Sequence, residues 1–176
     1  ICDRSGSMQQ GLKLAEQRRA AVLLMEALKE FAERVQEEKV NLSKPLEVKS
    51  EVYAFQANDQ DAMPLKKMSV ELGEKERIDV ADRLASAPGP KTTDFIPLET
   101  IYSSIGEEDK KNIEEGALKK IVVVFTDGES SDVRRVQQSL EQLRKVGVIV
   151  VCVGITQEGA TALTTYAPDG RLANKA

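Results

Sequence analysis

The chain has 176 residues, of which 41% are hydrophobic and 31% are charged, and its formal net charge is −4. This composition is typical of a folded globular domain and excludes a largely disordered chain, and the lack of a basic stripe disfavours a nucleic-acid partner. No apolar run approaches the roughly 20 residues that cross a bilayer, and no segment resembles a signal peptide. We therefore expect one domain over residues 1–176, without a membrane segment and cut at both ends from a longer protein.

The cysteines and the missing histidine narrow the chemistry further. Cys2 and Cys152 both lie in apolar, strand-like segments, where buried free thiols are expected. Free thiols favour a reducing compartment, so we expect a cytoplasmic location. The sequence has no histidine, which excludes a Ser-His-Asp or Cys-His catalytic arrangement within this chain and a zinc site built on histidine.

Strand-like and helix-like segments alternate through the first half of the chain. After a short strand-like start, hydrophobic residues recur at three- and four-residue steps over 9–38 and predict a long helix. The stretch LEVKSEVYAF at 46–55 alternates apolar and polar residues, as half-exposed strands do, and LKKMSV at 65–70 predicts a short edge strand. A second helix is expected over about 75–86. Its inner face would hold Ile78, Ala81, Leu84 and Ala85.

The second half begins with a helix and a buried strand. Asp94 is placed to cap a helix whose inward side chains are Leu98, Ile101 and Ile105. The run KIVVVFTDG at 120–128 is almost continuously apolar and ends in a turn, which is typical of a central parallel strand.

The alternation continues to the end of the chain. An amphipathic helix is expected from Val133 to Val146, stopped by Gly147. The run VIVVCVGIT at 148–156 predicts a second buried strand, and a short helix follows over about 159–167. Alternating strands and helices predict an α/β fold. We expect a Rossmann-like, open, mostly parallel sheet with helices on both faces and one short antiparallel edge strand.

Three polar clusters follow predicted strands or precede predicted helices. They are DRSGSM at 3–8, KTTD at 91–94 and FTDGESSD at 125–132. In open α/β sheets, ligands bind outside the carboxyl ends of the strands. Because the first and third clusters directly follow the most apolar strands, we expect them to converge on one edge of the sheet.

The first cluster presents oxygen atoms at alternate positions. In an extended loop, the side chains of Asp3, Ser5 and Ser7 point to the same side. Asp127 and a threonine of KTTD would complete a set of oxygen ligands with two carboxylates. Hard divalent cations such as Mg²⁺ prefer these ligands, and vacant coordination positions can accept an anionic group of a partner.

Each of these residues also has a simpler interpretation. The first cluster could be an Asx or Ser turn that ends a strand, and Asp127 could be an ordinary turn aspartate. Thr92 is the alternative to Thr93 as a ligand. Asp94 is expected to cap a helix. Arg4 is expected to be an exposed charge, with contact to an acidic partner as the alternative, and Met8 is expected to pack in the core.

Taken in chain order, the three clusters resemble the metal-ion-dependent adhesion site of the von Willebrand factor A (vWA) domain. The family pattern is Asp-x-Ser-x-Ser after the first strand, a Thr in a mid-chain loop and an Asp in a TDG turn after the fourth strand. The resemblance covers the whole chain, including its order of strands and helices. It implies a complete metal site with the ligands Asp3, Ser5, Ser7, Thr93 and Asp127.

The resemblance also implies a function. In this family the two serines contact the metal directly, the first Asp often acts through water, and a partner protein completes the metal shell with a Glu or Asp carboxylate. It therefore implies a binding module and no enzyme, with Mg²⁺ (or Mn²⁺ or Ca²⁺) as cofactor. The chain resembles intracellular bacterial members that are associated with AAA+ ATPases of the MoxR and metal-chelatase type, which implies an adaptor or subunit of such an assembly.

Two other functions stay open at this stage. The first is a metal-dependent phosphoryl transferase or hydrolase that uses Asp3 and Asp127 around Mg²⁺. We find no GxxxxGK[ST] loop, no histidine and no lysine close behind the DRSGS motif to support it. The second is an extracellular adhesion domain, which has the same fold but is usually secreted with a signal.

Overall fold

The computed structural model describes residues 1–38, 46–55, 62–85, 89, 92–128, 130–155 and 160–166. Its strands form one five-stranded sheet in the order β3-β2-β1-β4-β5. The strands are β1 (Cys2–Asp3), β2 (Ser50–Phe55), β3 (Met63–Ser69), β4 (Ile121–Thr126) and β5 (Ile149–Gly154). All neighbouring pairs are parallel except β2 and β3, which are antiparallel. The predicted α/β fold with one antiparallel edge strand is therefore confirmed.

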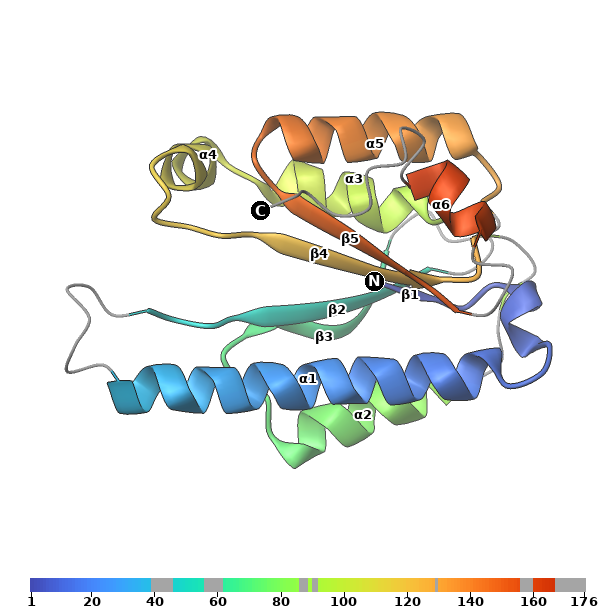
Figure 1. Ribbon diagram of the computed structural model, residues 1–176, viewed down its shortest axis with the longest axis horizontal. Helices are drawn as coiled ribbons and strands as arrows, with labels where there is room; N and C mark the ends of the chain where they lie inside the picture. The colour runs from blue at the N-terminus through green and yellow to red at the C-terminus, as the bar shows by residue number, and fades with distance from the viewer. Residues whose placement is uncertain are drawn as a thin grey trace.

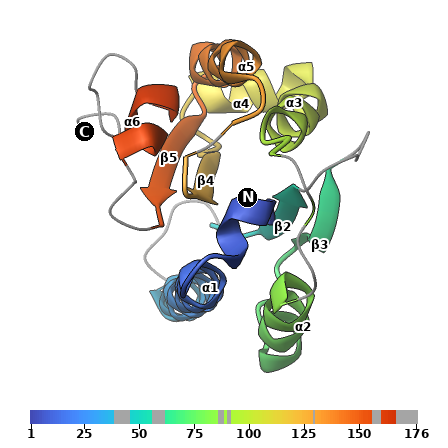
Figure 2. The same cartoon turned by 90° about the vertical axis from the view of Figure 1, so that its right-hand side faces the viewer.

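Helices cover both faces of this sheet (Figure 1). They are η1 (Gly6–Gln9), α1 (Lys13–Glu37), α2 (Glu74–Ala85), α3 (Phe95–Ser104), α4 (Glu107–Glu114), α5 (Val133–Lys145) and α6 (Ala160–Tyr166), where η1 is a single 3₁₀ turn. Figure 2 shows α1 and α2 on one face and α3, α5 and α6 on the other. None of the helices in the described ranges is long and apolar enough to cross a bilayer.

The long first helix begins later than its hydrophobic pattern predicts. It starts at Lys13, while the pattern predicts a helix from residue 9. Gly11 has φ +61°, in the left-handed region that a continuing right-handed helix cannot include. The chain therefore turns between η1 and α1, and this turn brings the start of α1 beneath the loop after β1.

The two faces of the sheet pack two separate hydrophobic clusters. The cluster under α1 and α2 contains Met8, Met25, Val80 and Leu84, so Met8 packs in the core as predicted. Ile78 was expected on the inner face of α2 but is 50% exposed. The buried stripe of this helix runs through Val80 and Leu84, a step of four residues.

The opposite cluster lies under α3, α5 and α6. Leu98, Ile101 and Ile105 are all buried there, as the sequence predicts, and Leu140 and Leu143 of α5 pack against them. Burial of this apolar area is the main force that fixes α3 and α5 on the sheet. The clusters on the two faces thus hold the strand ends in place, and the loops that follow β1 and β4 emerge side by side because these strands are paired.

Candidate metal site

The loop after β1 is folded around the carboxylate of Asp3. This side chain is fully buried, and its Oδ1 accepts the backbone N–H of Ser5 at 2.7 Å. The hydroxyls of Ser5 and Ser7 lie 3.0 Å apart and are hydrogen-bonded to each other. The alternate spacing predicted from the sequence therefore brings three oxygen-bearing side chains into one short loop.

A glutamine from α1 fixes the backbone of Asp3. Gln17 is fully buried; its Oε1 accepts the N–H of Asp3 at 3.1 Å, and its Nε2 donates to the carbonyl of Asp3 at 2.7 Å. Both backbone groups at the end of β1 are thereby satisfied by a side chain. Sequence reasoning did not find Gln17. Its signal is a step of four residues along α1, because the buried residues of that helix are Lys13, Gln17, Ala21 and Met25.

The end of β4 holds the other oxygen of Asp3. The hydroxyl of Thr126 donates to Asp3 Oδ2 at 2.7 Å and accepts the N–H of Gly128 at 3.0 Å. Asp3 therefore joins the first and third clusters directly, as expected from the pairing of β1 with β4. Sequence reasoning did not find Thr126 either, although it belongs to the FTDG turn.

Asp127 differs from Asp3 in its hydrogen bonding. Its Oδ2 accepts a hydrogen bond from the ammonium of Lys13 at 3.1 Å. Its Oδ1 is buried and has no hydrogen-bond partner among the described residues. Asp127 is only 3% exposed. A buried carboxylate oxygen without a donor is costly, and it is the atom in this site most ready to take a cation.

Lys13 is a component of the site that the sequence analysis missed. No lysine directly follows the DRSGS motif, but the turn at Gly11 brings Lys13, the first residue of α1, against the third cluster. The residue is 8% exposed. Buried lysines are rare unless they are paired with an acid, and Asp127 supplies that acid here.

Hydrogen bonds join the middle cluster to the third cluster, and join Gly89, two residues before the middle cluster, to the first cluster. The N–H of Gly89 donates to the carbonyl of Arg4 at 2.9 Å. The N–H of Ser131 donates to the carbonyl of Thr92 at 3.1 Å, and the N–H of Thr92 donates to the hydroxyl of Ser131 at the same distance. The three polar clusters therefore meet at one edge of the sheet.

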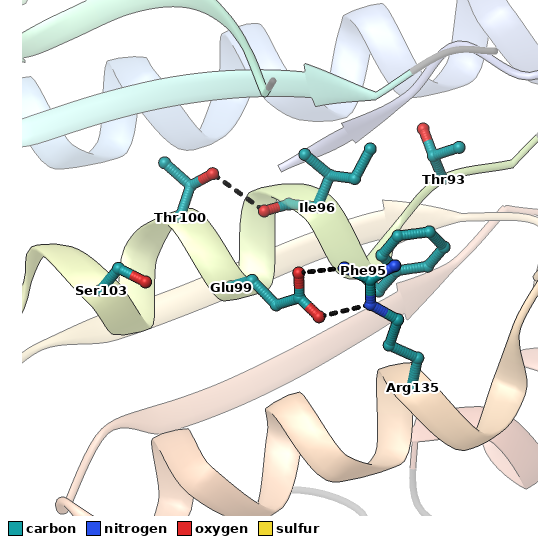
Figure 3. A pocket seen from close by; sticks show the side chains of 7 residues that line it. All are labelled: Thr93, Phe95, Ile96, Glu99, Thr100, Ser103 and Arg135. Atoms are coloured by element: carbon teal, nitrogen blue, oxygen red, sulfur yellow. Dashed lines mark hydrogen bonds and ion pairs between the residues drawn. The ribbon is translucent and has the colours of Figure 1, made fainter. Parts of the chain in front are cut away.

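The two threonines of the middle cluster lie in different environments. Thr92 is buried beside Ser131, while Thr93 is partly exposed and lines an open groove of about 580 Å³. Figure 3 shows Thr93 at one end of this groove. The partial exposure of Thr93 favours it over Thr92 as the threonine that a ligand can reach.

The rest of the groove is built from α3 and α5. Arg135 makes two hydrogen bonds to the carboxylate of Glu99, at 2.6 and 2.7 Å, and its guanidinium lies 4.1 Å from the centre of the Phe95 ring (Figure 3). Ile96, Thr100 and Ser103 complete the lining. The groove thus offers a polar wall next to Thr93.

Asp94 connects this region to the end of α6. It lies at the N-cap position of α3, but its side chain makes no capping hydrogen bond, so the predicted capping role is wrong. Its carboxylate instead accepts the hydroxyls of Ser130 and Tyr166, each at 2.7 Å. Burial raises the pKa of Asp94 to about 6, although the hydrogen bonds from Tyr166 and Ser130 oppose the rise.

Arg4 also differs from its prediction. It was expected to be an exposed charge, but it is buried, and its Nη1 donates to the sulfur of Met63 at 3.3 Å. The side chain therefore extends toward β3 across the edge of the sheet. The two cysteines, in contrast, are free thiols as predicted, with Cys2 buried and Cys152 partly buried.

The electrostatics of the site favour uptake of positive charge. Burial raises the pKa of Asp3 to about 6; the hydrogen bonds from Ser5 and Thr126 lower it, and the nearby charge of Asp127 raises it. Two buried carboxylates beside two hydroxyls match the oxygen ligands that Mg²⁺ or Ca²⁺ prefers. Across the described ranges, no group of three or more His, Cys, Asp or Glu side chains comes together, so a cation here would rely on hydroxyls as well. The residues present fit such an ion.

Comparisons with known proteins show the family and the fold. Residues 1–175 match the family model described as von Willebrand factor type A domain. A crystal structure of the conserved hypothetical protein BatB from Bacteroides thetaiotaomicron is similar in fold, with a TM-score of 0.59 and 15% sequence identity over 97% of this chain and 84% of that one. No curated protein matches the sequence.

Proposed function

The chain belongs to the von Willebrand factor type A domain family, and from this premise we propose that it is a docking module that binds a partner protein through a divalent cation. Domains of this family generally mediate protein–protein interactions and are generally not enzymes. The proposed cation is Mg²⁺, with Mn²⁺ or Ca²⁺ as substitutes. Its proposed ligands are Asp3, Ser5, Ser7, Thr93 and Asp127.

The observation that carries this proposal is Oδ1 of Asp127, which has no hydrogen-bond partner among the described residues. It lies buried at an edge where the hydroxyls of Ser5 and Ser7 are also gathered. Asp3 is anchored by Ser5 and Thr126, so it contributes negative charge from a fixed position. A bound divalent cation supplies positive charge with coordination positions that the chain itself does not fill.

The remaining side chains define how a partner would approach. Ser5 and Ser7 are neutral, so the two carboxylates of the chain do not over-compensate a doubly charged ion. Thr93, one of the proposed ligands, also lines the groove that contains Glu99 and Arg135. We propose that a partner presents an Asp or Glu carboxylate to the cation and that its neighbouring residues lie toward this groove.

We also propose a class of partner and a cellular location. The resemblance of the polar clusters to intracellular bacterial vWA domains supports a role as adaptor or subunit of an AAA+ ATPase assembly. The free thiols of Cys2 and Cys152 support a reducing compartment such as the cytoplasm.

A metal-dependent phosphoryl transferase is the second candidate. Lys13 beside Asp127 is the observation that favours it, because an ammonium group next to a cation site can stabilise a transferred phosphate. The buried position of Lys13 and its ion pair weigh against this role, since its charge is already engaged.

The test is capture of partners from a lysate of the source cells with Mg²⁺ or with EDTA, alongside a phosphatase assay. We expect capture that needs Mg²⁺ and is lost in Asp127→Asn. The control is Asp132→Asn, because Asp132 is exposed and only caps α5 through the N–H of Arg135, a role that Asn also fills.

Two results would contradict docking. Capture that is the same in EDTA, or the same in Asp127→Asn, would remove the cation from the interaction. Phosphatase turnover in the wild type that Asp127→Asn abolishes would favour the phosphoryl transferase instead.

A further inference from the structure

Lys13 is a cation that the chain itself places in the proposed cation site. Its ammonium lies 3.1 Å from Oδ2 of Asp127, and the side chains of the two residues are 10% and 2% exposed. Because water is largely excluded around both groups, this interaction is stronger than a surface ion pair. A divalent cation at Oδ1 of Asp127, which has no hydrogen-bond partner among the described residues, therefore shares this carboxylate with the ammonium.

We propose that Lys13 is a built-in counter-cation that a divalent ion must displace from Asp127, so that it lowers the affinity of the site for the ion. The inference rests on the proposed cation site. An ammonium and a divalent ion on the same carboxylate repel each other at short range. An ion that enters at Oδ1 faces the ammonium on Oδ2 across a single carboxylate. This repulsion drives Lys13 away from Oδ2, and the cost of that movement is subtracted from the binding free energy.

The position of Lys13 permits this movement. It is the first residue of α1, and the residue before it, Leu12, is 72% exposed. A lysine has a flexible four-carbon stem with the charge at its tip. The ammonium can therefore move away from Oδ2 of Asp127 while the backbone of α1, held by the two bonds between Gln17 and Asp3, stays in place.

Charge balance gives this lysine a second consequence. The carboxylates of Asp3 and Asp127 together cancel the charge of one divalent ion. With the ion bound, the ion, the two carboxylates and the ammonium of Lys13 together carry a net charge of about +1. One carboxylate from a partner neutralises that charge, so Lys13 favours docking of an acidic group only after the ion has entered.

A purely structural lysine would behave differently. If the pair between Lys13 and Asp127 served only to stabilise the fold, its removal would destabilise the chain and leave the affinity for the ion unchanged or lower. The direction of the affinity change thus separates the two roles.

The test is a Mg²⁺ titration by calorimetry, repeated with Mn²⁺ by electron paramagnetic resonance, on the wild type and Lys13→Met. Methionine keeps most of the length of the stem and removes the charge. We expect Lys13→Met to bind the ion at least about tenfold more tightly, which corresponds to about 1.4 kcal/mol. Lys13→Arg keeps the charge and should bind like the wild type. Lys29→Met is the matched control, because Lys29 lies on the same helix in an ion pair with Glu33.

A second readout covers loss of stability in the variant. In EDTA, Lys13→Met should melt at a lower temperature than the wild type, because Asp127 is left buried without its counter-charge. Added Mg²⁺ should raise its melting temperature by more than it raises that of the wild type. Lys13→Gln, whose amide can still donate to Asp127, replaces Lys13→Met in both measurements if the latter does not fold.

The outcomes separate this inference from the proposed function. Equal or weaker ion binding by Lys13→Met and Lys13→Gln, with normal binding by the wild type, overturns the role of Lys13 and leaves the cation site standing. Binding by the variants but not by the wild type supports the inference in its strongest form. If neither the wild type nor the variants bind Mg²⁺ or Mn²⁺, both the site and the inference are wrong.

Discussion

The two buried aspartates at the ends of β1 and β4 are held in opposite ways. Both oxygens of Asp3 accept a hydrogen bond from the chain, one from Ser5 and one from Thr126. In Asp127, one oxygen accepts a hydrogen bond from Lys13, and the other has no hydrogen-bond partner among the described residues. From this difference we propose that Asp3 is part of the framework, while Asp127 is the group that responds to a cation.

If Asp3 belongs to the framework, the residues that hold it should matter for stability. Gln17→Leu should have the largest effect, because the N–H and the carbonyl of Asp3 both lose their partner in a buried position. We expect a loss of about 3 kcal/mol in the free energy of unfolding, measured by urea denaturation in EDTA. Gln36→Leu, at an exposed position of the same helix, is the control and should change stability little. Equal effects of the two substitutions would contradict the framework role.

Thr126→Val removes the second support of Asp3. Valine keeps the shape but loses the hydroxyl that donates to Asp3 and accepts from Gly128. The expected loss is about 2 kcal/mol in the same denaturation experiment. Thr100→Val is the comparison, because the hydroxyl of Thr100 only bonds back to the carbonyl of Ile96 within α3. A larger loss for Thr100→Val than for Thr126→Val would be inconsistent with a buried network around Asp3.

Asp94 resembles Asp3 in that both of its oxygens accept hydroxyl donors. Its pKa of about 6 in the folded chain lies above the ordinary value of 3.8, so the folded state binds the proton more tightly. The stability that this proton contributes is fully present below about pH 3.8 and is lost as the pH rises through about 6. Through Asp94, the free energy of unfolding in EDTA should therefore rise by on the order of 1 kcal/mol between pH 7 and pH 5.

The variant Asp94→Asn isolates that contribution. Because the asparagine side chain cannot titrate, the free energy of unfolding of the variant should rise less than that of the wild type over the same pH interval. Asp3 contributes equally to the pH dependence of both proteins. Parallel pH profiles of wild type and variant would show that Asp94 does not carry the expected proton.

The smallest effect is expected in the groove beside Thr93. Glu99→Gln breaks the pair with Arg135, but both side chains are substantially exposed, so the loss should stay below about 0.5 kcal/mol. Cation affinity should not change. A loss comparable to that of Thr126→Val would mean that the groove belongs to the framework rather than to the docking surface.

The parts that could be predicted from the sequence are those with a local signal. Apolar runs and helical periodicity predicted the parallel strands and the buried face of α3, including Leu98 and Ile101. The alternate spacing of Asp3, Ser5 and Ser7 predicted that their side chains point to one side, and the hydroxyls of Ser5 and Ser7 do meet, although Ser7 lies in the 3₁₀ turn η1. These patterns depend on neighbours in the chain, so no tertiary information was needed.

The parts that could not be predicted depend on tertiary contacts. Lys13 and Gln17 are polar residues at the start of a charged helix, where a solvent-facing position is the ordinary interpretation. Only the turn at Gly11 and the docking of α1 beneath β1 bring them under the strand ends. The same holds for the burial of Arg4 and for the contact of Asp94 with Tyr166, which is distant in sequence.

The most direct test of the central claim is a Mg²⁺ titration of the wild type and Asp127→Asn by calorimetry after treatment with EDTA. The account predicts one bound ion per wild-type chain and at least about 100-fold weaker binding in Asp127→Asn. Asp127→Asn should also be less stable in EDTA, because Lys13 loses its counter-charge, so both titrations are made well below the melting temperature of the variant. Equal affinity of the two proteins, or no binding by the wild type, would contradict it.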